Sequence, residues 1–136
     1  MSDVNLWAVL AAAVSAFVLG GAWYSPALFG NVWNREAGIT AEMLARAKSP
    51  GHGARVFASA FVLALVASVA FARWLDPDAD VLDAVQLGFC AGLCFVGTSF
   101  GINYLFAQRS WKMFLIDAGY HTAQFTLYGL IIGAWR

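Results

Sequence analysis

Four long apolar stretches constrain this chain more than any other feature of its sequence. They run over residues 6–23, 56–72, 84–107 and 114–135. The hydrocarbon core of a bilayer is about 30 Å thick, and a helix needs about 20 mostly apolar residues to cross it. Each stretch is therefore predicted to be a transmembrane helix. The 136 residues are predicted to form one all-α, polytopic membrane domain.

The overall composition agrees with a membrane protein. Hydrophobic residues make up 61% of the chain and charged residues only 12%, whereas soluble domains average about 45–50% and about 25%. The net charge is zero, so no basic excess exists to hold a nucleic-acid backbone. Motifs for a serine nucleophile, a phosphate loop, a dinucleotide fold or a zinc protease are absent from the sequence. An enzyme is therefore the least supported class, and no catalytic residue, cofactor or metal ligand is assigned.

The distribution of cations in the loops predicts the orientation of the chain. Cytoplasmic loops of membrane proteins carry an excess of Lys and Arg. We therefore expect the loop over residues 24–55 and the loop after the third helix to lie in the cytoplasm. Both termini and the second loop would lie outside, on the periplasmic side of the cell (inner) membrane. The cations of the two cytoplasmic loops are Arg35, Arg46, Lys48, Arg55, Arg109 and Lys112, against Arg73 and Arg136 on the other side.

The first loop is predicted to contain short helices. Ser25 and Pro26 form an N-cap followed by proline at the first helical position, and the next apolar residues share one helical face. A short interfacial helix lying on the membrane is expected there. A second short helix is expected from Thr40 to Lys48. Residues 49–53 are expected to end it and to place His52 in a loop.

Glycine pairs four residues apart predict close helix packing. In lipid, helices associate through close backbone approach at small residues, because no hydrophobic force drives them together. This packing serves either contacts within one chain or contacts between chains, and the pattern fits both. The pairs are Gly88 with Gly92 and Gly97 with Gly101 in the third helix, and Gly129 with Gly133 in the fourth.

The fourth apolar stretch carries a polar stripe. Asp117, His121, Gln124 and Tyr128 are spaced four, three and four residues apart, so they fall within about 60° of one helical face. An ionisable side chain inside a membrane usually faces the bundle interior or water. Such a stripe is suited to a proton path, an ion site or a ligand pocket. The alternative is structural: Asp117 pairs with Lys112, Arg109 or His121 and locks the helix.

Other polar side chains are expected at the same depth as this stripe. The predicted topology brings Trp23, Tyr24, Asn103 and Tyr120 close to the cytoplasmic end of the fourth helix. They form either a functional cluster with Asp117 and His121 or hydrogen bonds that hold helices together.

Two cysteines lie four residues apart in the third helix. Cys90 and Cys94 are interpreted as small buried core residues. Metal binding together with His121 is the weaker alternative, because this spacing alone is not a metal motif.

Several sequence blocks together resemble a known family. They are Gly20-Gly-Ala-Trp-Tyr-Ser-Pro-Ala-Leu-Phe-Gly30, the run Asn103-Tyr-Leu-Phe106, and Asp117-Ala-Gly-Tyr-His121. Together they resemble the family catalogued as domain of unknown function 1761, over residues 5–135. The resemblance implies a small four-helix membrane protein and supplies no activity.

Three functions are compatible with these features. The first is a homo-oligomeric membrane protein that binds or passes a small solute, ion or proton through the polar stripe. The second is a non-catalytic accessory subunit of a larger membrane protein complex. The third is a membrane enzyme that acts at the cytoplasmic-side cluster and needs a cofactor or metal.

Overall fold

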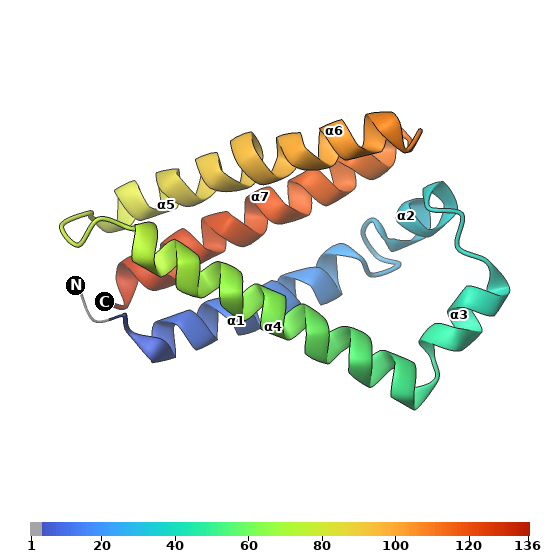
Figure 1. Ribbon diagram of the computed structural model, residues 1–136, viewed down its shortest axis with the longest axis horizontal. Helices are drawn as coiled ribbons and strands as arrows, with labels where there is room; N and C mark the ends of the chain where they lie inside the picture. Colours follow the sequence, from blue (N-terminus) through green and yellow to red (C-terminus); the bar gives the residue numbers. More distant parts are fainter. Residues whose placement is uncertain (1–3) are drawn as a thin grey trace.

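The computed structural model describes residues 4–136 and is built from helices (Figure 1). In chain order the elements are α1 (Leu6–Trp23), α2 (Gly30–Glu36), α3 (Ala41–Ala47), α4 (Pro50–Trp74), α5 (Val81–Cys90), η1 (Ala91–Gly97), α6 (Thr98–Phe106) and α7 (Trp111–Ala134). The two short helices α2 and α3 connect α1 to α4, and the π-helical segment η1 joins α5 to α6 without a break.

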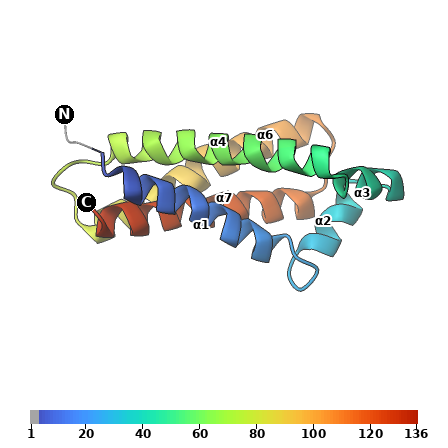
Figure 2. The ribbon, with the colours of Figure 1, turned by 90° about the horizontal axis from the view of Figure 1, so that it is seen from below.

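Helix α7 is the centre of the arrangement. It contacts α1, α2, α4 and each part of the α5–η1–α6 rod, which runs alongside it for nearly its whole length (Figures 1 and 2). The start of α1, the end of α7 and the loop over residues 75–80 lie at one end of the molecule. Helices α2 and α3 and the turn over residues 107–110 lie at the other end.

Within residues 4–136, three helical segments are long and apolar enough to cross a membrane. They are α1, α4 and the continuous rod Val81–Phe106. Helix α7 has sufficient length but does not meet the same criterion of apolarity. Its polar side chains lower the mean hydropathy, and two of them, Asp117 and Gln124, are buried against other helices.

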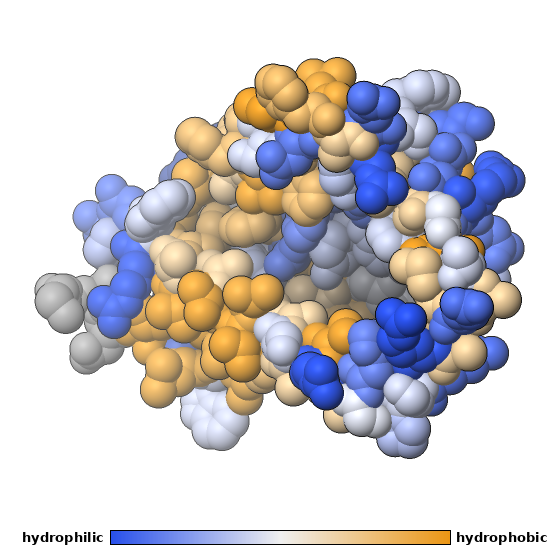
Figure 3. Space-filling view, turned by 45° about the vertical axis from the view of Figure 1, so that its right-hand side comes forward, coloured by the Kyte–Doolittle hydropathy of each residue, from blue (hydrophilic) through white to orange (hydrophobic). Residues whose placement is uncertain are grey.

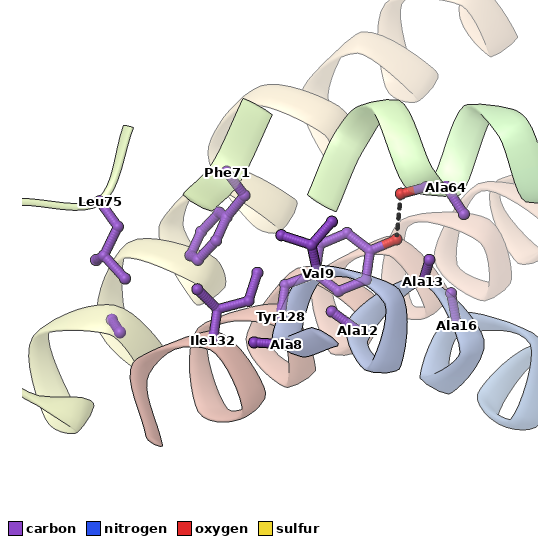
Figure 4. Packing of buried hydrophobic residues seen from close by; sticks show 11 residues of the cluster. Ala8, Val9, Ala12, Ala13, Ala16, Ala64, Phe71, Leu75, Tyr128 and Ile132 are labelled. Carbon is purple, nitrogen blue, oxygen red and sulfur yellow. Dashed lines mark hydrogen bonds between the residues drawn. The ribbon is translucent and has the colours of Figure 1, made fainter. Parts of the chain in front are cut away.

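The core is built from small residues of α1 packed against larger side chains of α4 and α7 (Figure 4). Tyr128 of α7 is fully buried, and Phe71 of α4 packs edge-on against its ring. Alanines allow close approach of helices without leaving voids, which suits packing that relies on van der Waals contact. The α1 residues of this core are Ala8, Val9, Ala12, Ala13 and Ala16.

Glycines bring α5 and α7 into backbone contact. A Cβ atom on Gly88 would overlap the carbonyl oxygen of Phe125, and one on Gly129 would overlap that of Ala84. A Cβ on Gly133 would lie 2.7 Å from the Cβ of Ala84. These three glycines are therefore used for contacts within the chain.

The same face continues along the rod toward α6. A Cβ on Gly92 would lie 2.6 Å from Cα of Thr122. Further along, a Cβ on Gly97 would lie 3.5 Å from a side chain of α7, and one on Gly101 would lie 3.1 Å from the ring of Phe114.

The π-helical segment keeps these glycines on one face. Gly88 and Gly92 are spaced four residues apart, as are Gly97 and Gly101, but Gly92 and Gly97 are spaced five residues apart. Five α-helical residues overshoot one full turn by about 140°, at about 100° per residue. The wider π turn, with i→i+5 hydrogen bonds, absorbs the additional residue. Segment Ala91–Gly97 adopts this form.

Polar side chains fix the ends of several helices. Asn5 accepts hydrogen bonds from the first turn of α1, Thr40 accepts one from Met43 at the start of α3, and Asp80 forms a capping box with Asp83 at the start of α5. The predicted helix beginning at Thr40 is therefore present.

Two local predictions for the first loop are wrong. Ser25 does not cap a following helix, because its hydroxyl donates back to the Ala22 carbonyl and α2 begins only at Gly30. Residues 50–53 do not form a loop, because Ser49 is the N-cap of α4 and Pro50 is its first residue. A Ser-Pro pair signals a helix start as readily as a stop, since proline is tolerated in the first turn.

The prediction for the two cysteines is also wrong. Cys90 and Cys94 are exposed rather than buried in the core. The glycine face of the rod points to α7, and the cysteines lie away from it. Among the described residues no three His, Cys, Asp or Glu side chains come together in a way that suits a metal ion.

Candidate functional site

A buried carboxylate lies where four elements meet. Asp117 of α7 is only 5% exposed. Its Oδ1 accepts hydrogen bonds from the Tyr24 hydroxyl after α1 and, at 3.0 Å, from Nε1 of Trp33 on α2. Its Oδ2 accepts from the Tyr104 hydroxyl on α6. The two carboxylate oxygens are thus satisfied by three aromatic donors, which offsets the cost of removing the group from water.

In the part of the chain that the structure describes, no Lys, Arg or His side chain forms an ion pair with Asp117. Lys112 pairs instead with Glu36 of α2, with 3.9 Å between its Nζ and Oε1 of the glutamate. The predicted ion pair of Asp117 with Lys112 or Arg109 is therefore not formed. Burial and the hydrogen bond to Asp117 both raise the pKa of the Tyr24 hydroxyl, so that it stays protonated and remains a donor.

The local chain path explains how these donors reach α7. After α1 the backbone turns tightly, and a Cβ on Gly30 would overlap the carbonyl oxygen of Tyr24. Helix α2 then packs on α7, which directs Trp33 toward Asp117. Two further bonds tie α1 to α7: Trp23 Nε1 donates to the Ile116 carbonyl at 2.9 Å, and the Tyr120 hydroxyl donates to the Ala16 carbonyl at 2.9 Å.

A second polar group lies one turn further along α7. Nδ1 of His121 is 2.8 Å from Oε1 of Gln124, whose Nε2 donates to the Tyr128 hydroxyl at 2.7 Å. The Tyr128 hydroxyl in turn lies 3.2 Å from the Ala64 carbonyl oxygen of α4 (Figure 4). The ring of Phe100 stacks on the His121 ring, with 4.9 Å between centroids. This chain of hydrogen bonds links α7 to α4.

The predicted stripe therefore divides into two hydrogen-bonded groups. Asp117 belongs to the first, and the other three stripe residues belong to the second. Tyr24 lies beside Asp117, but Asn103 is exposed and forms no side-chain hydrogen bond with any described residue. The adjacent Tyr104 occupies the expected place.

Sequence reasoning missed two of the three donors to Asp117. Trp33 is one of the apolar residues of the interfacial helix expected in the first loop, and Tyr104 enters the sequence analysis only within the family block Asn103–Phe106. The spacing of the glycines indicates that Tyr104 faces α7. Because the five-residue gap before Gly97 requires a wider turn, positions 97, 101 and 104 face α7 together.

A cavity of about 710 Å³ lies beside the second polar group, between α1, α4 and α7. Its walls are largely apolar, and His121 and Gln124 are the polar side chains that α7 contributes to it besides Tyr120. Phe57 and Leu63 of α4 line it while remaining 65% and 69% exposed, so the cavity opens through the side of the helical bundle. Figure 3 shows a face of the molecule that is hollowed near its middle.

A second groove, of about 740 Å³, lies elsewhere on α7, between α1 and the α5–η1 rod. Its polar side chains are Thr122 and Thr126, whose hydroxyls donate to carbonyls of their own helix, each at 2.7 Å. Their donors are therefore already used, and the groove presents an apolar surface. The cavity beside His121 is the better candidate for recognition of a polar group.

Comparison with known proteins gives one match. A family model described as "Protein of unknown function (DUF1761)" matches residues 7–133. No curated protein matches the chain. No solved structure matches it either.

Proposed function

We propose a function from the premise that this chain belongs to the DUF1761 family, whose description as a protein of unknown function supplies no activity to transfer. The protein is an integral membrane protein in which α1, α4, the α5–η1–α6 rod and α7 all span the bilayer. It binds a small lipophilic solute in the cavity beside His121.

The proposal for α7 rests on where its polar side chains lie. Asp117 and Gln124 are buried and hydrogen-bonded, and Tyr128 is fully buried. These residues lower the mean hydropathy of α7 whether they face lipid or the interior of the bundle. A spanning helix tolerates such residues when they face the interior of the bundle.

The cavity beside His121 is the observation that carries the proposal for binding. It has apolar walls, a few polar atoms on one side, and an opening through the side of the bundle. Ligand sites commonly combine mostly apolar linings with a few placed polar groups. A lateral opening admits molecules that are dissolved in the bilayer. Passage of an ion or proton has less support, because Asp117 and the His121–Gln124–Tyr128 group form two separate sets of hydrogen bonds and no hydrogen bond links the one to the other.

Equilibrium dialysis tests this binding. The protein in lipid nanodiscs is dialysed against empty nanodiscs of the same lipid, with 2-naphthol as the probe. We expect a saturable excess of naphthol on the protein side. Ala60→Trp, which places a large ring in the cavity, is expected to abolish this excess. Ala58→Trp is the matched control, since Ala58 is also exposed on α4 but does not line the cavity.

Either of two results would overturn the proposal. One is the lack of a saturable excess with the wild-type protein. The other is equal binding by wild type and Ala60→Trp, which would mean that the probe binds to lipid or to another surface of the protein.

We also propose that the protein is a homo-oligomer in the cell (inner) membrane, with both termini outside. The alternative is an accessory subunit of a larger membrane complex. Because Gly88, Gly129 and Gly133 pack within the chain, subunit contacts would use other faces, such as the exposed outer face of α4. Native mass spectrometry of the gently solubilised protein separates the two: a defined homo-oligomer supports the first, and a stoichiometric foreign protein supports the second.

A further inference from the structure

The hydrogen-bond chain behind the cavity has a fixed direction. It ends at the Ala64 carbonyl oxygen, which can only accept. The Tyr128 hydroxyl must therefore give its proton to Ala64, and its oxygen accepts from the Gln124 amide. The Oε1 atom of Gln124 is then left facing Nδ1 of His121 at 2.8 Å. Because this oxygen also only accepts, Nδ1 must carry a proton.

A neutral imidazole with a proton on Nδ1 has an unprotonated acceptor at Nε2. Within residues 4–136 this Nε2 has no hydrogen-bond partner, while every fully buried side-chain nitrogen or oxygen has one. Nε2 is therefore accessible. His121 is half-buried and its ring lines the 710 Å³ cavity, whose walls are largely apolar.

We propose that the cavity selects lipophilic molecules carrying a hydrogen-bond donor, such as a phenol or alcohol hydroxyl, which donates to Nε2 of His121. This inference rests on the proposed function and specifies its ligand class. A molecule that carries only hydrogen-bond acceptors would leave Nε2 without a donor. One of its acceptor atoms would then face Nε2, which is also an acceptor. An unmade hydrogen bond in an apolar site costs enough to give about a tenfold preference for the donor.

Nitrogen NMR tests the direction of the chain without any ligand. The protein has only two histidines, so His52→Ala leaves a single imidazole to observe. With 15N-labelled histidine, we expect a protonated, pyrrole-type signal for Nδ1 and an unprotonated, pyridine-type signal for Nε2. A protonated Nε2, with or without a proton on Nδ1, would overturn the proposal.

Dialysis with a pair of matched probes tests the selectivity. The probes are 2-naphthol and 2-methoxynaphthalene, in which a methyl group replaces the hydroxyl proton. The binding of each probe is corrected for its partition into empty nanodiscs. We expect about tenfold tighter binding of the naphthol to wild type. His121→Phe keeps an aromatic ring but removes the acceptor, so both probes are expected to bind with similar affinity.

Tyr128→Phe tests the fixed direction from a distance. Tyr128 is fully buried and does not line the cavity. Without its hydroxyl the Gln124 amide is free to turn over, so that its Nε2 donates to an unprotonated Nδ1 and the imidazole proton moves to Nε2 of His121. The preference for naphthol is expected to fall severalfold. Should this variant fail to fold, the NMR result and His121→Phe still decide the question.

The outcomes separate this inference from the proposed function. Equal binding of the two probes to wild type overturns donor selection but leaves binding in the cavity intact. Saturable binding of neither probe overturns the proposed function itself.

Discussion

At the scale of single residues, Asp117 is a buried carboxylate that depends on hydrogen-bond donors from other parts of the chain. It is buried, its partners are neutral, and they come from three different elements. A charge-assisted hydrogen bond contributes about 1.5–3 kcal/mol to stability. We therefore expect Asp117→Asn, which keeps the shape but loses the charge, to lower the free energy of unfolding by about 2 kcal/mol. Thermal or denaturant unfolding in detergent measures this loss.

Two further variants calibrate this result. Trp33→Phe removes one charge-assisted donor to Asp117 and is expected to cost about 1.5–3 kcal/mol. Asp78→Asn, at an exposed position in the loop over residues 75–80, serves as the control and is expected to change nothing. An Asp117→Asn protein as stable as wild type would show that the three donors do not need a carboxylate.

At the scale of elements, the contact between α5 and α7 depends on glycine at particular positions. A Cβ on Gly88 would overlap backbone of α7, whereas a Cβ on Gly21 of α1 would meet no atom within 4 Å. Alanine favours both helices equally by propensity, so this pair isolates the packing effect. We expect Gly88→Ala to destabilise the protein by about 1–3 kcal/mol and Gly21→Ala to be neutral or slightly stabilising. Parallel unfolding curves make the comparison, and equal effects would contradict the close packing.

The π-helical segment supports a prediction about deletions. Phe95 lies within the five-residue gap between Gly92 and Gly97 and is exposed. Its deletion would reduce the gap to four residues, so an ordinary α-helix would keep both glycines facing α7. We expect this protein to fold, as judged by a monodisperse peak in size-exclusion chromatography and cooperative unfolding.

The matched control is deletion of Phe89, which is also exposed but lies between Gly88 and Gly92. This deletion rotates the start of α5 away from α7, and we expect it to prevent folding. Similar behaviour of the two deletions would mean that the π turn does not serve to align the glycines.

At the scale of the whole molecule, the ends of the helices give two groups of loops. One contains the start of α1, the end of α7 and the loop over residues 75–80, and the other contains α2, α3 and the turn over residues 107–110 (Figure 1). With Cys90 and Cys94 replaced by alanine, single cysteines can report on which side each position lies. We expect a membrane-impermeant maleimide to label Asp78→Cys on intact cells but not Lys48→Cys.

The same labelling tests whether α7 spans the membrane. Arg109→Cys is expected to behave like Lys48→Cys, and a cysteine added after Arg136 is expected to behave like Asp78→Cys. Labelling of Arg109→Cys from outside would contradict the proposed span, the proposed orientation, or both. Permeabilised cells, in which every site must react, provide the control.

The sequence by itself determined the helical class, the family and the approximate extents of the long helices. Apolar runs of this length satisfy their backbone hydrogen bonds internally only as helices, and that constraint is local. The motif blocks over residues 20–30 and 117–121 likewise depend only on residue order, and the family match over residues 7–133 confirms the resemblance.

The tertiary structure alone decided which polar residues meet. Four-residue spacing placed Asp117 and His121 on one face of α7, but it did not show that different helices bind them. Trp33 and Tyr104 reach Asp117 because a tight turn carries α2 onto α7 and a π turn rotates α6 toward it. The direction of the His121 chain depends on a carbonyl of α4, 57 residues away in sequence. Such contacts depend on how whole helices pack, and periodicity within one helix carries no information about its neighbour.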